Sequence, residues 1–267
     1  MIPTIERFSG LADRYDANRP RPPQALMDIL TQLTGIAQPG LVVDLGSGTG
    51  LSTVVWAERA TQVIGVEPNA DMRMQAEART AALPNARNVR YVAAIASQTG
   101  LPDGCADIVT CSQSLHWMEP EPTFAEVARI LRVGGLLAAY DCDWPPTMNW
   151  HAEAAWNKFV GEGEALGEAR GWYEGVEKWS KDKHLSRIQA SGRFRHVKEI
   201  VAHGEELGNA DRLVGLALSQ GGVADLLKHG LSEKEIGLDE FRAICERTIG
   251  PDPIPWYFSY RVRLGIK

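Results

Sequence analysis

The stretch VVDLGSGTG, residues 42–50, decides the fold of this chain. Its two valines run into Asp44, and glycines follow at Gly46, Gly48 and Gly50. The pattern is typical of a buried strand that ends abruptly, because glycine adopts positive φ and lets another group approach the backbone closely. A helix expected after the loop would present its unpaired N–H groups to a ligand. The stretch therefore predicts a binding loop at the end of a buried strand.

Outward from this loop, short apolar runs alternate with helical patterns. The run LVVDL lacks polar alternation, as expected for a strand covered on both faces. Strands alternating with helices at this spacing predict right-handed βαβ units and an α/β fold with a doubly wound, mostly parallel sheet. The expected strands are 41–45, 62–67, 89–94, 106–112 and 135–141, and the expected helices are 24–35, 52–60, 72–83 and 122–133.

The second half of the chain follows a looser pattern. Residues 144–192 carry five tryptophans among glycines and acidic helix formers, which indicates a helical cap inserted into the fold. The sheet is expected to resume near 194–207 and to close with an aromatic-rich strand at 255–267, with helices at 209–229 and 233–248 between them. We therefore predict an N-terminal helical segment at 1–40, a ligand-binding core at 41–143, the cap at 144–192 and the remainder of the core at 193–267.

Composition excludes several classes of partner. With 267 residues, 44% of them apolar and 23% charged, the chain can bury a sizeable core. A net charge of −6 without a lysine- and arginine-rich run in the sequence argues against nucleic acid. No stretch approaches about 18 uninterrupted apolar residues, so no membrane association is expected. The scattered cysteines predict buried thiols in a reducing cytoplasm, and the isolated histidines predict no metal site.

The spacing of the glycines distinguishes between two kinds of ligand. The dinucleotide fingerprint G-x-G-x-x-G would place its third glycine at position 51, where this chain has Leu51. The carboxylate of Asp44 suits the amino end of an amino acid better than a pyrophosphate. Glu67 ends the second expected strand, where it can accept both hydroxyl groups of a ribose. Together the two carboxylates favour a nucleoside that carries an amino acid.

Four ordered segments resemble the class I S-adenosylmethionine-dependent methyltransferases. VVDLGSGTG is similar to their glycine-rich cofactor motif, and VIGVEPNADM to the strand and acidic residue that bind the ribose. LPDGCADIVTCSQSLHWME and FAEVARILRVGGLLAAYD resemble the following segments in the small-molecule branch, which includes trans-aconitate-type and quinone-biosynthesis-type enzymes. The likeness covers roughly residues 8–142. It implies a Rossmann-like fold of seven strands with an antiparallel last strand, and S-adenosyl-L-methionine as the cofactor, released as S-adenosyl-L-homocysteine.

The resemblance also implies roles for individual residues. The glycines would line the methionine moiety with Asp44 near its amino group, and Glu67 would hold the ribose. Asn69 or Met72 would flank the adenine, and Arg19 would reach the cofactor carboxylate. Many members carry an acidic residue where this chain has Ala96 and Ser97, so Ser97 or the backbone would read the adenine edge. The full set of expected cofactor contacts is Tyr15, Arg19, Asp44, Gly46, Ser47, Gly48, Thr49, Gly50, Glu67, Pro68, Met72, Ala96, Ser97 and Ser112.

Two interpretations of His116 stay open. It follows the fourth expected strand, so it is a candidate general base, whereas the alternative is a residue that walls the cofactor site beside Trp117. For the acceptor we predict contacts from Trp117, Trp144, Trp150 and Trp172, although tryptophans of the cap can equally form its core. A carboxylate acceptor would need a cation, and the nearest candidates in the insertion are Arg170 and Lys178.

The predicted function is transfer of a methyl group to a small-molecule acceptor by in-line displacement. Such a reaction mainly needs alignment of the two reactants and exclusion of water, so it requires neither a catalytic triad nor a metal cluster. The alternatives are a macromolecular acceptor, a nicotinamide-dependent oxidoreductase, and a cofactor-binding partner subunit that has lost catalysis. Leu51 and the lack of a Tyr-x-x-x-Lys set in the sequence disfavour the oxidoreductase.

Overall fold

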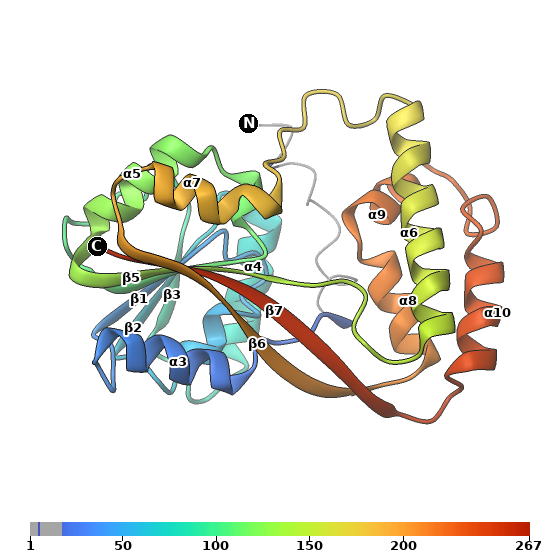
Figure 1. The fold of residues 1–267 in the computed structure, drawn as a ribbon, viewed down its shortest axis with the longest axis horizontal. Coiled ribbons are helices and arrows are strands. Elements are labelled where there is room, and N and C mark those ends of the chain that lie inside the picture. Colours follow the sequence, from blue (N-terminus) through green and yellow to red (C-terminus); the bar gives the residue numbers. More distant parts are fainter. Residues whose placement is uncertain (1–4, 6–17) are drawn as a thin grey trace.

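The computed structural model describes residue 5 and residues 18–267 (Figure 1). Its strands form one sheet in the order β3-β2-β1-β4-β5-β7-β6. The first five strands pair in parallel, and β7 is antiparallel to both β5 and β6. This confirms the predicted doubly wound, mostly parallel fold with an antiparallel last strand. The bounds are β1 Leu41–Leu45, β2 Gln62–Val66, β3 Val89–Val92, β4 Ala106–Ser112, β5 Leu131–Cys142, β6 Arg195–Gly208 and β7 Ile254–Ile266.

Helices cover both faces of the sheet, which explains the unalternated apolar run of β1. Val42 faces a core cluster that includes residues of α3 (Gln24–Thr34) and Trp56. Val43 faces a second cluster that includes residues of α5 (Pro120–Ile130) and α7 (His184–Ala190). Successive side chains of β1 therefore enter opposite apolar layers, and none of the strand's central residues reaches solvent. α4 (Ala70–Ala81) joins β2 to β3.

A separate helical lobe stands beyond the end of the sheet (Figure 1). In the described part of the chain its helices are α6 (Trp150–Ala169), α8 (Ala210–Leu218), α9 (Gly221–Lys228) and α10 (Leu238–Thr248). Aromatic rings hold the lobe together, since Phe159 of α6 stacks on Phe241 of α10 with 4.7 Å between ring centroids. At 20 residues α6 is the longest described helix, and no helix in the described part of the chain is both long and apolar enough to cross a membrane.

The lobe is formed by other segments of the chain than the cap expected at 144–192. Only α6 comes from that segment, whereas α8, α9 and α10 come from the connection between β6 and β7. α7, which was expected in the cap, packs on β6 and β7 instead. The reason lies in the long β6–β7 ribbon, which extends from the sheet to the lobe and carries its connecting helices there (Figure 1).

Two local expectations also differ from the structure. The segment 52–60 forms a 3₁₀ helix, η1 (Thr53–Trp56), flanked by turns rather than a regular α-helix. Three β-branched residues in a row disfavour the α-helix, and Thr53 turns its hydroxyl to Asp44 instead of to solvent. In the second case α5 ends at Ile130 and β5 begins at Leu131, so the glycine pair at 134–135 lies inside the strand rather than between helix and strand.

Candidate functional site

The glycine loop is fixed to the neighbouring strand by its backbone. The amides of Gly46 and Ser47 donate to the carbonyl oxygen of Val66, at 2.8 and 3.2 Å, so the loop crosses from the end of β1 to the end of β2. Gly46, Gly48 and Gly50 all have positive φ. At Gly46 a Cβ would lie only 2.7 Å from Ser114 Cβ, so both the conformation and the space demand glycine there.

A first cavity opens at the carboxyl ends of β1, β2 and β4. Strand order reverses beside β1, and ligands of doubly wound sheets bind at such a switch point. Most of the predicted cofactor contacts line this cavity, namely Arg19, Gly46, Ser47, Gly48, Thr49, Glu67, Pro68, Met72, Ala96, Ser97 and Ser112. The structure therefore brings together residues that lie far apart in the sequence. The most distant pair, Arg19 and Ser112, is separated by 93 positions.

Glu67 closes one side of the first cavity. Its carboxylate accepts a hydrogen bond from the amide of Gly48 at 2.9 Å and another from the amide of Asn69 at 2.8 Å. Burial raises the pKa of this carboxyl, while the two amide donors and Arg73 oppose the rise. Each oxygen retains a lone pair for a further donor, as binding of vicinal hydroxyl groups requires.

Two of the predicted cofactor contacts in the described part of the chain, Asp44 and Gly50, do not line the cavity. Asp44 lies beneath the loop, fully buried, where it accepts hydrogen bonds from Thr53 and Thr110. Gly50 packs against Tyr91, and a side chain there would collide with the tyrosine hydroxyl. Tyr15 lies outside the described residues. Asp44 thus supports the loop through η1 and β4, and its carboxylate reaches neither cavity in this arrangement.

Burial of Asp44 gives folding stability a specific pH dependence. Its pKa is raised from 3.8 to about 6, mainly by burial, with smaller opposing effects from the two threonine hydroxyls. A folded-state pKa above the unfolded value contributes stability that is fully present below pH 4 and is lost as pH rises through 6, by about 3 kcal/mol. Asp44→Asn is expected to remove this loss. Urea unfolding at several pH values between 4 and 7 tests it, and parallel curves for the two proteins would contradict it.

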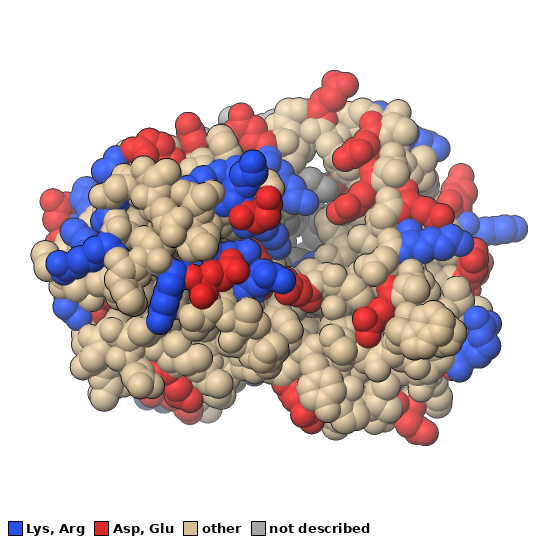
Figure 2. Space-filling model, viewed as in Figure 1, with Lys and Arg blue, Asp and Glu red and all other residues tan. Residues whose placement is uncertain are grey.

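A second cavity lies between the sheet and the helical lobe, and Figure 2 shows the hollow from one side. It shares Arg19, Gln113, Trp117 and Trp144 with the first cavity, so the two spaces adjoin. Arg19 spans the junction, because its guanidinium lies 4.9 Å from the ring centre of Trp144 and donates to the Ser219 hydroxyl and carbonyl oxygens. A group bound in the first cavity can therefore face one bound in the second.

His116 lines the second cavity but is almost wholly enclosed. Its ring is 6% exposed, and its Nδ1 lies 3.7 Å from an oxygen of Asp141. Burial, together with the nearby charges of Lys181 and Lys178, holds the pKa of His116 well below its usual range. A neutral imidazole that binds a proton this weakly is a poor general base for a hydroxyl group. The structure thus favours the interpretation of His116 as a wall of the site.

A buried charge network supports that wall from below. Asp141, at the end of β5, contacts Lys181 at 2.9 Å and Arg263 at 2.9 Å. Arg263 also bonds to Glu199, which ties β5, β6 and β7 together. The two carboxylates of Asp141 and Glu199 therefore face the two cations Lys181 and Arg263, so the positive charge of Lys181 is largely compensated in the protein itself.

The predicted acceptor contacts separate into two groups. Trp117 and Trp144 line both cavities. Trp150 and Trp172 line neither: Trp150 begins α6, is 70% exposed and stacks on His151, and Trp172 stacks on His229. Trp150 begins α6 and Trp172 follows its end, whereas the residues of α6 that line the second cavity, Glu164 and Glu168, lie in its last two turns.

Gln113 and Ser114 belong to the site although the sequence analysis assigned them no role. Gln113 has φ of 54°, an uncommon value for a residue with a side chain, and it lines both cavities. The Ser114 hydroxyl donates to the carbonyl oxygen of Leu45 and fills the space under Gly46. Their position directly after β4, next to the switch point, was the available signal.

Comparisons with known proteins agree with this geometry. Residues 43–139 match a family model described as a methyltransferase domain. An uncharacterized methyltransferase of Mycobacterium bovis is 34% identical over 130 residues, which is 49% of each chain. The chain thus spans about half the length of the curated relatives it matches.

Solved structures resemble the chain over most of its length. A putative type II methyltransferase from Anaeromyxobacter dehalogenans aligns with a TM-score of 0.68 and 22% identity, over 94% of this chain and 98% of that one. A geranyl diphosphate C-methyltransferase from Streptomyces coelicolor, solved with Mg²⁺, geranyl diphosphate and S-adenosyl-L-homocysteine, aligns at 0.50 and 17% identity, over 91% and 77%. At these identities the likeness establishes the fold.

Proposed function

We propose that this chain, whose residues 43–139 match a methyltransferase domain, transfers a methyl group from S-adenosylmethionine to a small-molecule acceptor. The observation that carries the proposal is the pair of adjoining cavities. One lies over the glycine loop and Glu67, and the other lies between the sheet and the helical lobe. Two reactants held side by side in this way can react within one enclosed space.

The residues of the first cavity fit S-adenosylmethionine chemically. The Ser47 hydroxyl is buried at the cavity and has no hydrogen-bond partner in the described part of the protein. Gly48 has open space where a side chain would lie, and Glu67 offers a carboxylate whose lone pairs are only partly used. Buried polar groups normally find partners, so an orphaned hydroxyl beside open backbone supports a polar ligand at this loop.

The chain's own part in the reaction is to bind, align and exclude water. When bound, S-adenosylmethionine supplies a methyl group on a sulfonium centre that is already activated for displacement. Glu67 would hold the ribose, the glycine loop would receive the methionine moiety, and Arg19 would reach its carboxylate. Trp117 and Trp144 form the wall shared with the acceptor cavity, and His116 closes that wall without moving a proton.

A small acceptor is supported by the enclosure of the second cavity. The segment that joins α6 to α7 passes over it, and the amide of Trp179 donates to the carbonyl oxygen of His116 at 2.7 Å, which attaches this cover to the segment that follows β4. A cavity covered in this way suits a molecule that can enter whole. The Streptomyces coelicolor neighbour, by its description, methylates a small prenyl diphosphate, which is in keeping with this proposal.

Calorimetric titration tests the proposal. S-Adenosylhomocysteine is expected to bind with a stoichiometry of one, and NAD is expected to give no heat of binding, because Leu51 replaces the third glycine of a dinucleotide loop. Binding of NAD without binding of S-adenosylhomocysteine would overturn the proposal in favour of an oxidoreductase. If S-adenosylhomocysteine binds but no acceptor is methylated, the chain is a cofactor-binding protein without methyltransferase activity.

A further inference from the structure

The second cavity has walls of opposite charge. Lys178 and Lys181, from the segment between α6 and α7, lie on the wall that includes His116, and both lower the pKa of that histidine. Glu164 and Glu168 come from α6 on the other wall. Figure 2 shows basic side chains on the sheet side of the hollow and acidic ones along the helical lobe. An acceptor is therefore oriented by its own charge.

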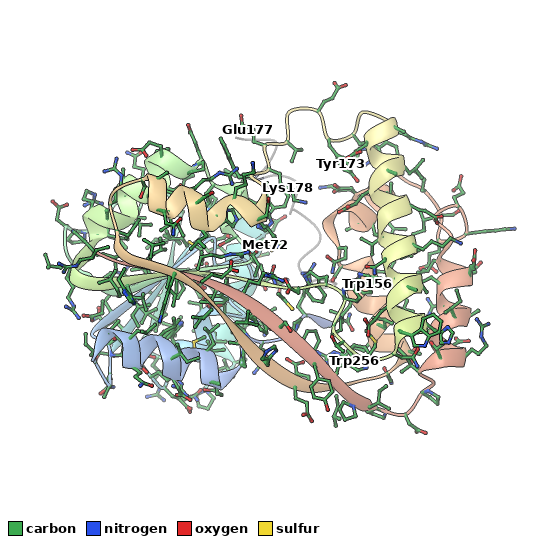
Figure 3. All side chains as sticks on the ribbon, viewed as in Figure 1. Met72, Trp156, Tyr173, Glu177, Lys178 and Trp256 are labelled. Atoms are coloured by element: carbon green, nitrogen blue, oxygen red, sulfur yellow. The ribbon has the colours of Figure 1, made fainter. Side chains whose placement is uncertain are left out.

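Of the two lysines on this wall, Lys178 is the one that remains available to a ligand. Lys181 is held by Asp141 at 2.9 Å and by Gln113 at 3.1 Å. The Lys178 ammonium lies 5.7 Å from the ring centre of Trp117 and forms no ion pair with any residue that the structure describes. Because Trp117 lines both cavities, this ammonium lies near their junction, and Figure 3 shows it on the sheet side of the gap, with Tyr173 on the α6 side.

The groups around this junction also restrict the nucleophile. Lysine ammonium groups have no lone pair at neutral pH, and His116 binds a proton only weakly. Glu164 and Glu168 are carboxylates, which are weak bases towards a hydroxyl group. None of these groups can therefore activate an alcohol or a phenol efficiently. A carboxylate needs no such help, because it is already ionised at neutral pH.

We infer that the acceptor is a monocarboxylic acid with an apolar or aromatic body, and that Lys178 binds the carboxylate that becomes methylated. The inference rests on the proposed function. One carboxylate oxygen forms the new bond to the methyl carbon, the bond from that carbon to sulfur breaks, and its electron pair stays on sulfur. No proton moves, and the products are a methyl ester and S-adenosylhomocysteine.

The other residues of the second cavity determine how many negative charges the acceptor carries and whether its body is apolar. A second carboxylate would meet Glu164 and Glu168 on the α6 wall, and like charges repel most strongly in a partly enclosed site. Trp144 and Leu218 supply apolar surface between the two walls. The expected acceptor thus carries its single negative charge at one end and packs its body against the tryptophan.

The test of the acceptor class uses phenylacetate and octanoate against matched compounds that lack the acid. Phenylacetamide, 2-phenylethanol and 2-phenylethylamine share the aromatic body, and glutarate carries a second carboxylate. Both monocarboxylates are expected to bind to the protein saturated with S-adenosylhomocysteine, measured by calorimetry, and to be methylated with S-adenosylmethionine present. Glutarate and the uncharged compounds are expected to bind at least about 10-fold more weakly, since they lose or oppose the charge pairing.

Variants of Lys178 test the residue. Lys178→Met keeps most of the stem and is expected to raise the KM of phenylacetate by about 10-fold, because a charged hydrogen bond is lost, with the Kd of S-adenosylhomocysteine unchanged. Lys178→Arg should restore most of the affinity. Lys183→Met, on the same segment but outside both cavities, is the matched control.

Two results would overturn the inference while leaving the proposed function intact. The first is that S-adenosylhomocysteine binds but the alcohol or the amine is methylated. The same conclusion follows if S-adenosylhomocysteine binds but neither monocarboxylate binds or is methylated. The second is a Lys178→Met variant whose KM for phenylacetate equals that of the wild type. Failure of S-adenosylhomocysteine itself to bind would instead overturn the proposed function.

Discussion

Glu67→Ala is expected to raise the Kd of S-adenosylhomocysteine by about 100-fold, since it removes two charge-assisted hydrogen bonds within the loop and the acceptor proposed for the ribose. The amides of Gly48 and Asn69 both donate to this carboxylate, so its loss also frees the glycine loop. Glu67→Gln keeps one acceptor oxygen and should weaken binding by about 10-fold. Calorimetric titration measures both variants.

A matched control distinguishes the loss of Glu67 at the cofactor site from the general effect of replacing a glutamate by alanine. Glu77, on the outer face of α4, is exposed and lines neither cavity, so Glu77→Ala should bind S-adenosylhomocysteine like the wild type. Thermal unfolding of the free proteins shows whether Glu67→Ala remains folded. A folded Glu67→Ala protein with wild-type affinity would exclude Glu67 from the cofactor site.

The sheet could be predicted from the sequence because its signals are local. β1, β2 and β4 are short, mostly buried runs whose side chains enter apolar layers on both faces of the sheet, so their sequences lack polar alternation. The edge strand β3 is shorter and exposes Arg90. The end of α5 was harder to predict from the sequence, because Gly134 and Gly135 are typical of a helix end. Here they lie within β5, where Gly134 has φ of 78° and a Cβ on Gly135 would lie 2.9 Å from the Arg132 carbonyl oxygen.

The helical lobe could not be assigned from the sequence because it depends on contacts between distant segments. α6 pairs with α10, which begins 69 residues after α6 ends at Ala169, and nothing in either amphipathic pattern identifies its partner. The length of β6 and β7 decides the arrangement. The two strands pair over twelve positions and carry α8, α9 and α10 away from the sheet towards α6.

The candidate site was predictable where one loop or strand end supplies the residues. The glycine loop, Glu67 and Ser97 follow strands whose carboxyl ends meet at one edge, so a cavity there follows from topology. Asp44 shows the limit of that reasoning, because adjacency in sequence did not reveal that Thr53 and Thr110 occupy both of its oxygens. The second cavity needs α6 and α9 to be placed opposite the end of the sheet, which no local pattern encodes.

Gly46→Ala is expected to lower the free energy of unfolding by about 3 kcal/mol, from left-handed strain and overpacking together. The residue has φ of +63°, and a Cβ would lie 2.7 Å from Ser114 Cβ and 2.8 Å from Met118 Cε. Relief of this clash has to displace the loop from its place beside Ser114, which would disturb the hydrogen bonds from its amides to Val66. Thermal unfolding should show a Tm lower by about 5–10 °C, and S-adenosylhomocysteine should no longer stabilise the variant.

Gly192→Ala isolates the part of this effect that comes from the backbone alone. Gly192 has nearly the same φ, +64°, but has nothing within 4 Å of the position of an added Cβ, and it lies outside both cavities. It should therefore lose only about 1 kcal/mol and keep its response to S-adenosylhomocysteine. The difference between the two variants measures the contact of Gly46 with Ser114 and Met118. Equal losses would show that the loop yields easily, and that close packing beneath it does not hold the cavity in shape.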